Sequence, residues 1–176
     1  KSSLAGSFMF LVSNLKLIFK MKTGRIFTGI AGEYFVAGEL SRRGIVAALT
    51  LRNTADIDIV ASSADGVKMA NIQVKSRRRD KMDGWDMGNK PLDVNKNWQK
   101  IFYILVDLSS LSNEDKINYY VIPKNILNKK VEGIFKKWRS GLKKSGEKRK
   151  SERRMFKFKQ IPELMKYKNR WDILEL

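Results

Sequence analysis

The sequence predicts an α/β fold in which helices flank a mixed central sheet. Three observations predict it: a helical apolar pattern over residues 26–43, several apolar or alternating runs between residues 45 and 123, and a second helical pattern that begins near Pro123. The elements follow the order helix, three strands, long loop, two strands and helix, which indicates helices packed on a mixed sheet. A chain of 176 residues with 43% hydrophobic residues fits one globular domain.

The first half of the chain supplies one helix and three strands. The helix is predicted over residues 26–43, where Gly44 supplies a stop. A short apolar strand follows at residues 45–51. Two adjacent strands are predicted within residues 56–79, joined by the turn sequence SSADG at residues 62–66.

The second half begins with a long polar segment. Residues 76–99 contain Gly84, Gly88 and Pro91 and are predicted to form a loop with one helical turn at most. Loops of this length in a compact domain are usually functional. The remaining predictions are a strand buried on both faces at residues 101–108, a strand at 117–123, a helix from 123 to 142, a charged linker at 143–154 and an amphipathic helix over 161–174.

Residues 1–20 are predicted to be an extension outside the domain. Their apolar run is too short, and too soon interrupted by lysines, to span a bilayer, and it lacks a clear signal-peptide cleavage site. Met21 opens a stretch that resembles a natural start. We therefore expect one domain over residues 21–176, with its core at 26–130 and a basic C-terminal region at 131–176, in a protein that is cytoplasmic and nucleoid-associated rather than secreted.

The composition restricts both the partner and the chemistry. The formal net charge is +18, from 36 basic and 18 acidic residues, which favours a polyanionic partner over a merely solvated basic surface. The chain has no cysteine and no histidine, which excludes disulfides, a Ser-His-Asp site and a zinc site held by histidine. Hydrolytic chemistry would have to use carboxylates, lysines and a hard cation bound by oxygens.

Two neighbouring predicted strands each carry one apolar face and one polar face, because side chains alternate along a strand. The apolar faces carry Ile57 and Ile59 on the first strand, and Ile72 and Val74 on the second. The polar faces carry Asp56 and Asp58 on the first strand, and Gln73 and Lys75 on the second. Each strand therefore has a side suited to a core and a side suited to chemistry.

The first helix places a glutamate on its apolar face. Spaced at about 100° per residue, Glu33 lies in the middle of the apolar stripe. The stripe consists of Ile26, Ile30, Val36, Ala37 and Leu40. A carboxylate aimed at a core is unfavourable unless a cation or hydrogen bonds meet it, so Glu33 either reaches water at the end of the stripe or belongs to a site. Glu33, one or both aspartates, and Gln73 can together bind Mg²⁺ or Mn²⁺, with Lys75 beside the metal.

The segments GEYFVAGEL, DIDIVA and IQVKS resemble the restriction-endonuclease-like PD-(D/E)xK nuclease superfamily. The nearest relatives would be archaeal Holliday-junction resolvases and methylation-dependent restriction enzymes, some of which carry Q-x-K. The resemblance covers residues 26–108. It implies an αβββαβ core, Mg²⁺- or Mn²⁺-dependent endonuclease activity on double-stranded or branched DNA, and a homodimer.

The resemblance assigns roles to four catalytic residues. Glu33 matches the helix glutamate that helps to hold the metal, and Asp58 matches the strand aspartate that ligates it. Gln73 stands at the D/E position and Lys75 is the motif lysine. Two departures are Ile57 in place of proline and the neutral Gln73, which should lower metal affinity and favour one ion over two. Asp56 is the rival to Asp58; it is expected to cap the preceding turn or to support the ligands.

Basic residues near this motif are candidates for binding nucleic acid. They are Arg77, Arg78, Arg79 and Lys90 beside the motif, and Lys136, Lys137 and Arg139 in the C-terminal region. From Lys129 to Lys159 there are fourteen basic residues and three glutamates, with interleaved aromatic residues Phe135, Trp138, Phe156 and Phe158. This region either grips a backbone or is a solvated, partly disordered linker at residues 143–154.

Other aromatic residues are open to two interpretations. Trp85 and Trp98 either contact bases or anchor their loop, whereas Tyr119, Tyr120 and Trp171 belong to a core or a dimer interface.

Two functions remain open: a metal-dependent endonuclease, and a non-catalytic nucleic-acid-binding module on a decayed nuclease core. A peripheral membrane protein is a third interpretation, but it leaves the pattern of Asp58, Gln73 and Lys75 unexplained.

Overall fold

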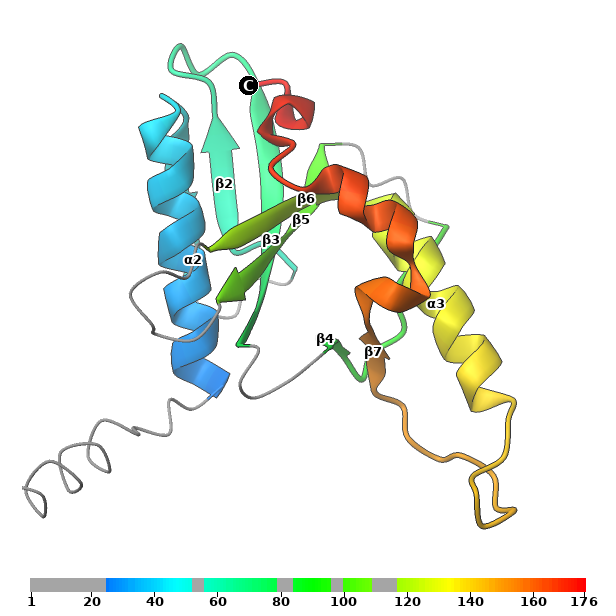
Figure 1. Cartoon of the computed structure of the whole chain (residues 1–176). Coiled ribbons are helices and arrows are strands. Elements are labelled where there is room, and N and C mark those ends of the chain that lie inside the picture. Colours follow the sequence, from blue (N-terminus) through cyan, green and yellow to red (C-terminus); the bar gives the residue numbers. More distant parts are fainter. Residues whose placement is uncertain (1–24, 52–55, 79–83, 96–99, 109–116) are drawn as a thin grey trace, which may run out of the picture.

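The computed structural model describes residues 25–51, 56–78, 84–95, 100–108 and 117–176. A five-stranded sheet with the order β1-β2-β3-β5-β6 lies between two helices (Figure 1). The helices are α2 (Arg25–Arg42) and α3 (Lys124–Arg139), and the strands are β1 (Val46–Leu49), β2 (Ile59–Ser62), β3 (Met69–Arg78), β5 (Ile101–Leu108) and β6 (Asn118–Pro123). The predicted α/β class, with a mixed sheet flanked by helices, is confirmed. The predicted extension at residues 1–20 lies outside the described residues.

Only one pair of strands in this sheet is parallel. β3 and β5 run parallel, with Gln73 beside Tyr103 and Lys75 beside Leu105, while the other neighbours are antiparallel. The connection from β3 to β5 contains β4 (Trp85–Gly88), which pairs with β7 (Arg154–Phe156) in a separate two-stranded sheet. The prediction of a plain loop at residues 76–99 missed β4, because its partner lies more than sixty residues further along the chain.

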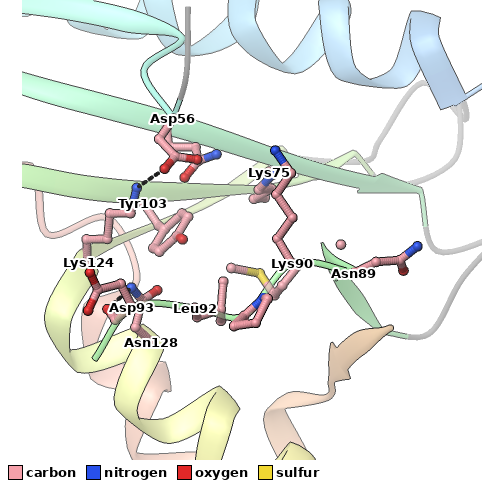
Figure 2. Close-up of a pocket in the computed structure, with 13 residues that line it drawn as sticks. Asp56, Lys75, Asn89, Lys90, Leu92, Asp93, Tyr103, Lys124 and Asn128 are labelled. Atoms are coloured by element: carbon pink, nitrogen blue, oxygen red, sulfur yellow. Dashed lines mark hydrogen bonds and ion pairs between the residues drawn. The ribbon is translucent and has the colours of Figure 1, made fainter. Parts of the chain in front are cut away.

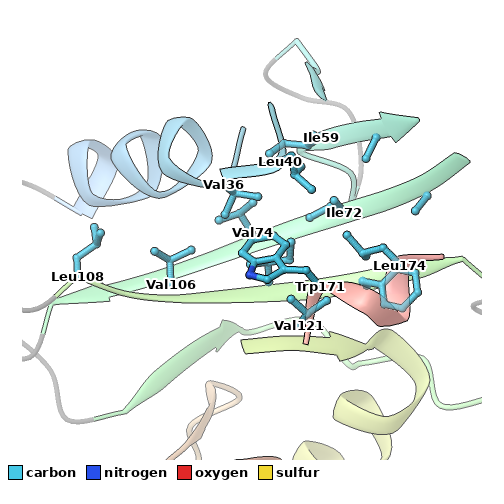
Figure 3. Close-up of a cluster of buried hydrophobic side chains, with 14 residues drawn as sticks. Val36, Leu40, Ile59, Ile72, Val74, Val106, Leu108, Val121, Trp171 and Leu174 are labelled. Atoms are coloured by element: carbon cyan, nitrogen blue, oxygen red, sulfur yellow. The ribbon is translucent and has the colours of Figure 1, made fainter. Parts of the chain in front are cut away.

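One core lies between the sheet and α2 (Figure 3). Val36 and Leu40 of α2 are fully buried against Ile59, Ile72 and other alternate residues of the strands. Two residues near the C-terminus, Trp171 and Leu174, complete this cluster. Tyr119 packs on Trp171 with ring centroids 5.3 Å apart, so the prediction of a core role for these aromatic residues is confirmed.

A second core lies on the opposite face of the sheet, under α3. It contains Tyr103 and Leu105 of β5, Tyr120 and Ile122 of β6, Leu127 and Val131 of α3, and Trp85, Phe156, Ile161 and Leu164. Because β5 contributes alternate residues to both cores, seven of its eight residues are buried. The prediction of a strand buried on both faces at residues 101–108 is confirmed.

Helix α2 approaches the sheet closely at a glycine. Gly32 lies against β3, where a Cβ atom would be 1.7 Å from Ser76 Oγ and 3.5 Å from Val74 Cγ1. Val74 and Ser76 therefore belong to the face that α2 covers, and Gln73 and Lys75 belong to the face that α3 covers. The helix ends as predicted before Gly44, whose φ of +76° suits glycine.

The C-terminal region is more compact than the sequence predicts. The predicted amphipathic helix over residues 161–174 is wrong: two short 3₁₀ helices, η2 (Pro162–Tyr167) and η3 (Trp171–Leu174), occupy the segment. Between them Lys168 is extended and bridges to Tyr120, and Asn169 has a φ of +54°, so one continuous helix is impossible. A third short helix, η1 (Phe158–Gln160), precedes them.

The predicted charged linker at residues 143–154 is an ordered turn. Lys143 N–H donates to Glu147 O at 2.8 Å, Gly146 turns the chain with a φ of +82°, and Leu142 bridges to Lys148. The segment then leads directly into β7, and in Figure 1 it projects beyond the end of α3. None of the described helices is long and apolar enough to cross a membrane.

Candidate functional site

Asp58, Gln73 and Lys75 lie together on the α3-facing side of the sheet. The pairing of Ile59 with Ile72 is continued by one residue through a hydrogen bond from Asp58 N–H to Ile72 O at 2.8 Å. Asp58 therefore lies across from Gln73, and Lys75 follows on the same face. This register confirms the predicted polar face for Asp58, Gln73 and Lys75, but the prediction was wrong for Asp56, which lies outside β2 with a φ of +65°.

The carboxylate of Asp58 takes the place of a strand partner for one backbone N–H group of β3. Its Oδ2 accepts a hydrogen bond from Val74 N–H at 2.7 Å, at a point where β2 no longer pairs with β3. Burial raises the pKa of Asp58, although this hydrogen bond and the nearby Lys75 ammonium act in the opposite direction. The carboxylate is thus fixed in position while its charge is incompletely compensated.

Gln73 and Lys75 line a pocket of about 630 Å³ between the sheet, α3 and the loop 88–93 (Figure 2). Tyr103 of β5 lies in the same wall. Burial, together with the charges of Asp56 and Asp58, raises the pKa of the Tyr103 hydroxyl. Gln73 and Lys75, two of the residues predicted to carry chemistry, therefore border a cavity large enough for a small organic ligand.

Gln73 carries an unsatisfied acceptor in this wall. Its Oε1 is buried and has no hydrogen-bond partner among the described residues. A buried amide oxygen normally finds a donor or a cation, so this atom is suited to a ligand. Asp58 and Gln73 thus supply neighbouring oxygen donors of the type that Mg²⁺ or Mn²⁺ prefers.

The structure does not bring Glu33 to the same face as Gln73 and Lys75. Glu33 is half-buried on α2, immediately after Gly32, and α2 packs on the Val74 side of β3. Within the described part of the chain, no group of three or more acidic side chains is placed to hold a metal. A cation on the α3-facing side would therefore depend on Asp58 and Gln73, with Asp56 nearby.

Asp56 lies at the opening of the pocket rather than in a strand. It has a φ of +65°, its side chain is 61% exposed, and its carboxylate is 3.7 Å from Lys124 Nζ. The Lys124 side chain is only 3% exposed and its ammonium lies 5.4 Å from the centre of the Tyr103 ring. Asp56 thus links the sheet side of the pocket to the first turn of α3.

The sequence predictions missed the α3 wall of the pocket. Lys124 and Asn128 lie one turn apart on α3 and are buried beside Leu127 and Val131. Like Glu33 on the first helix, these two residues are polar side chains on the apolar face of an amphipathic helix. That signal was present in the sequence.

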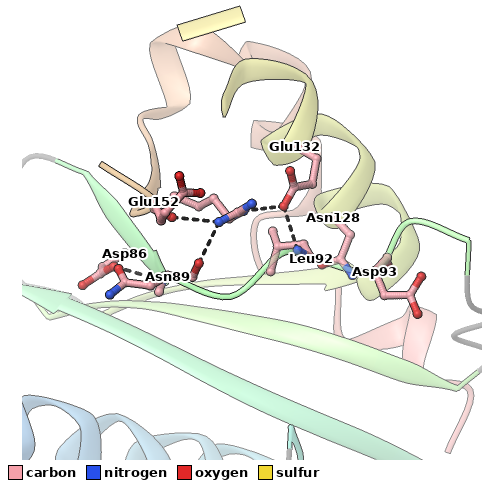
Figure 4. A network of polar contacts seen from close by, with 9 residues as sticks. Asp86, Asn89, Leu92, Asp93, Asn128, Glu132 and Glu152 are labelled. Carbon is pink, nitrogen blue, oxygen red and sulfur yellow. Dashed lines mark hydrogen bonds and ion pairs between the residues drawn. The ribbon is translucent and has the colours of Figure 1, made fainter. Parts of the chain in front are cut away.

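A buried polar network holds the loop 88–93 against α3 (Figure 4). Glu132 accepts hydrogen bonds from Leu92 N–H at 2.7 Å and from Arg154 Nε at 2.5 Å. Arg154 also donates to Asn89 O at 2.8 Å, and Asn128 Nδ2 donates to Asp93 O at 2.8 Å. The pocket wall is therefore fixed by contacts to α3 and β7.

Arg77, predicted to bind phosphate, has a different role. Its guanidinium makes a two-point ion pair with the fully buried Asp107, at 3.2 and 2.8 Å, and lies 4.5 Å from the centre of the Trp85 ring. Only 9% of Arg77 is exposed, so it is not presented to a nucleic acid. Trp85 is likewise buried and is a packing anchor rather than a base contact.

The other predicted basic contacts lie in several places. Lys90 is exposed at the pocket, and Arg78 is half-buried at the end of β3. Arg79 and Trp98 lie outside the described residues. Arg139 pairs with Glu152 at 2.8 Å.

The end of α3 and the following turn form a basic hairpin arm, defined as residues 136–150. Its exposed lysines include Lys136, Lys137, Lys144 and Lys148. Trp138 is 39% exposed and stacks against Arg149, whose guanidinium lies 5.1 Å from the ring centre. In contrast, the predicted interleaved residues Phe135 and Phe156 are buried and Phe158 is half-buried against Trp85 and Tyr120, so these three pack the protein interior.

Comparisons with known proteins do not assign the chain to a family. A scan of protein-family models finds none that matches the chain, and a search of curated proteins finds no match either. The chain's own residues, above all Asp58, Gln73 and Lys75, are therefore what indicates a function.

Proposed function

We propose that this chain is a metal-dependent DNA endonuclease that hydrolyses phosphodiester bonds. The observation that carries the proposal is the placement of Asp58, Gln73 and Lys75 on one face of the sheet, with Gln73 and Lys75 in the wall of a pocket that Lys90 and Lys124 also line. The β1-β2-β3-β5 order, with β3 and β5 parallel, supports the αβββαβ comparison. A departure is that the connection between them contains β4 rather than a helix in its described part.

The chain's own residues would position a metal, a water and a phosphate. Asp58 and the Gln73 carbonyl would hold Mg²⁺ or Mn²⁺, which when bound polarises phosphate oxygens and activates water. The Val74 N–H holds the Asp58 carboxylate in place. Lys75 orients the attacking water and offsets the charge that develops on phosphate. Glu33 has no assigned role in this arrangement, because α2 packs on the other face of β3.

The charge distribution supports a DNA substrate. The net charge of +18 favours a polyanion, and the basic hairpin arm presents lysines to solvent on the α3 side of the protein. Double-stranded or branched DNA could contact the arm and the pocket together. A homodimer would let two sites address two strands, and we expect the protein to act on DNA in the cytoplasm rather than at a membrane.

Cleavage of supercoiled plasmid and branched DNA tests the proposal. Purified protein is incubated with Mg²⁺, Mn²⁺ or EDTA, beside the variants Lys75→Met, Asp58→Asn and Lys130→Met. We expect metal-dependent cleavage that Lys75→Met lowers by about 100-fold or more, since one charge-stabilising group is removed. Lys130→Met is the matched control, because the Lys130 ammonium pairs with Glu163 outside the pocket. This variant should cleave DNA as the wild type does. Undiminished cleavage by both Lys75→Met and Asp58→Asn would refute the proposal.

The second function is a non-catalytic nucleic-acid-binding module. Two observations favour it: Gln73 brings no charge to a metal, and the described residues contain no cluster of three acidic groups placed for one. This function predicts tight, salt-sensitive DNA binding without cleavage in any metal. Calorimetric detection of Mn²⁺ binding that Asp58→Asn removes would count against it.

A further inference from the structure

The α3 wall of the pocket contains two polar side chains that are almost completely buried. Lys124 and Asn128 are 2% and 1% exposed, and both line the pocket. They lie four residues apart on α3, so their side chains leave the helix on the same face about 6 Å apart. Burying an ammonium and an amide side by side is unfavourable unless each meets a suitable partner.

Asn128 presents an unsatisfied acceptor. Its Nδ2 donates to Asp93 O at 2.8 Å, which fixes the orientation of the amide. The other end of the amide, Oδ1, is buried and has no hydrogen-bond partner in the described residues. An acceptor of this kind lowers stability until a donor reaches it, so a ligand that donates one hydrogen bond would be selected here.

The charge of the pocket selects an anion. Three ammonium groups line it, those of Lys75, Lys90 and Lys124, against the carboxylates of Asp56 and Asp93 (Figure 2). Lys124 is the most buried of them; its ammonium lies 3.7 Å from the exposed Asp56 carboxylate and 5.4 Å from the centre of the Tyr103 ring. The ligand that best complements this balance carries negative charge near Lys124 and Lys90.

Four of the other lining residues are apolar or aromatic and suit a ring system. Met87, Pro91, Leu92 and Tyr103 border the pocket, whose volume is about 630 Å³. Pockets of this size, mostly apolar with a few convergent polar groups, hold small organic ligands. A planar heterocycle with an amino group and a linked phosphate matches the lining in shape, hydrogen bonding and charge.

We propose that this pocket binds a nucleoside 5′-monophosphate unit. The phosphate lies near Lys124 and Lys90, and the exocyclic amino group of the base donates a hydrogen bond to Asn128 Oδ1. The unit is either a residue of the DNA strand next to the cleaved bond or a free mononucleotide. Only the first source rests on the proposed function.

Calorimetric titration in EDTA tests the proposal without any cleavage. The full chain is titrated with deoxyadenosine 5′-monophosphate, with deoxyadenosine, and with the purine deoxyriboside 5′-monophosphate that lacks the amino group. We expect the first to bind, and each of the other two to bind about tenfold more weakly, because each lacks one polar contact. No detectable heat with the first compound at millimolar concentration, or equal affinities for all three, overturns the proposal.

Three pocket variants locate the contacts. In Asn128→Leu the preference for the amino-bearing base should disappear, whatever happens to overall affinity. In Lys90→Gln, on the exposed loop, and in Lys124→Met, the preference for the phosphorylated compound should fall. Lys130→Met, on the same helix but paired with Glu163, is the control and should bind as the wild type does. An unchanged amino preference in folded Asn128→Leu, or an unchanged phosphate preference in folded Lys90→Gln and Lys124→Met, overturns the assignment.

Competition identifies the source of the nucleotide. A labelled single-stranded oligonucleotide is bound to the protein in EDTA, and the monophosphate is added. Displacement supports a strand residue in the pocket, and simultaneous binding supports a free mononucleotide. Nucleotide binding in a protein that never cleaves DNA would refute the nuclease and leave the pocket assignment intact, so the two failures are distinguishable.

Discussion

The carboxylate of Asp58 accepts a hydrogen bond from Val74 N–H, yet burial raises its pKa. A raised pKa means that the folded protein binds the proton more tightly than the unfolded chain, so ionised Asp58 opposes folding. The stability that protonated Asp58 contributes to the folded protein is therefore lost as the pH rises through the raised pKa. We expect Asp58→Asn to be more stable than the wild type at neutral pH, with the difference vanishing at acidic pH, in urea denaturation over a pH series.

Asp65 supplies the control with the opposite sign. The hydrogen bond from the Ser63 hydroxyl, reinforced by Val67 N–H, lowers the pKa of this exposed aspartate. Its ionised form therefore favours folding, and that contribution is lost as the pH falls through the lowered pKa. Asp65→Asn should be slightly less stable than the wild type at neutral pH. The same pH trend in both variants would contradict the assignment of Asp58.

Gln73 marks the position at which one change should strengthen metal binding. Gln73→Glu adds a carboxylate beside Asp58, so we expect Mn²⁺ affinity to rise about tenfold or more. Without metal the second buried carboxylate should lower the melting temperature, and Mn²⁺ should restore it. Gln73→Met, similar in size but without an acceptor, is the control. Absence of Mn²⁺ binding in wild type and Gln73→Glu would favour the non-catalytic module.

The Arg77–Asp107 pair is a stability element. Arg77→Met leaves the fully buried Asp107 without its ion-pair partner, which should reduce the free energy of unfolding by about 3–5 kcal/mol. Lys130→Met breaks an ion pair that is about half exposed and should change it by less than about 1 kcal/mol. Urea denaturation measures both. Equal small losses would show that Arg77 contributes no more than a surface residue.

For single residues, the alternation of side chains along a strand predicts part of the site. It places Gln73 and Lys75 on one side of β3 and Asp58 across from them, as found. The same alternation puts Arg77 on that side, where the register carries it to Asp107, but sequence alone does not reveal the buried carboxylate. Glu33 and Gln73 are separated because α2 covers the other face of the sheet. Which face a helix covers depends on packing between distant segments, so the local sequence does not reveal it.

The contact between α2 and β3 depends on one glycine. In Gly32→Ala the new methyl group would lie 1.7 Å from Ser76 Oγ and 2.8 Å from Ser76 Cβ, so the helix must move away from the sheet. We expect a loss of about 1–3 kcal/mol in the free energy of unfolding. Gly38→Ala, in the same helix with nothing within 4 Å, should instead gain about 0.5–1 kcal/mol. Similar effects for both would contradict the close approach.

Whether a helix or strand can be predicted from the sequence depends on how far along the chain its contacts lie. The helices and the strands of the main sheet carry their own hydrophobic periods, and all were predicted. β4 was missed because β7 defines it from a distance. The last predicted helix failed because its apolar residues serve two different cores, Leu164 on one side of the sheet and Trp171 on the other, which requires an interruption at Lys168 and Asn169.

For the molecule as a whole, the basic hairpin arm should set the salt dependence of DNA binding. Replacing Lys136, Lys137, Lys144 and Lys148 by glutamine should reduce the slope of log affinity against log salt by about 0.9 for each phosphate that the arm no longer neutralises. Fluorescence anisotropy with a labelled duplex measures this slope. The control replaces Lys68, Lys159, Lys166 and Lys168, exposed elsewhere, with the same reduction in net charge. Equal slopes for both variants would show that net charge alone governs binding.

The path of the last residues around β6 has a consequence for chain connectivity. Phe156, Ile161 and Leu164 belong to the core under α3, whereas Trp171 and Leu174 belong to the core under α2, so the terminal segment grips both sides of the sheet. The arm that leads into it is exposed and rich in trypsin sites. A nick there should leave two pieces that co-elute under native conditions, and pieces expressed separately should reassemble. The covalent link at the arm is then dispensable, and the protein is a natural candidate for a split reporter.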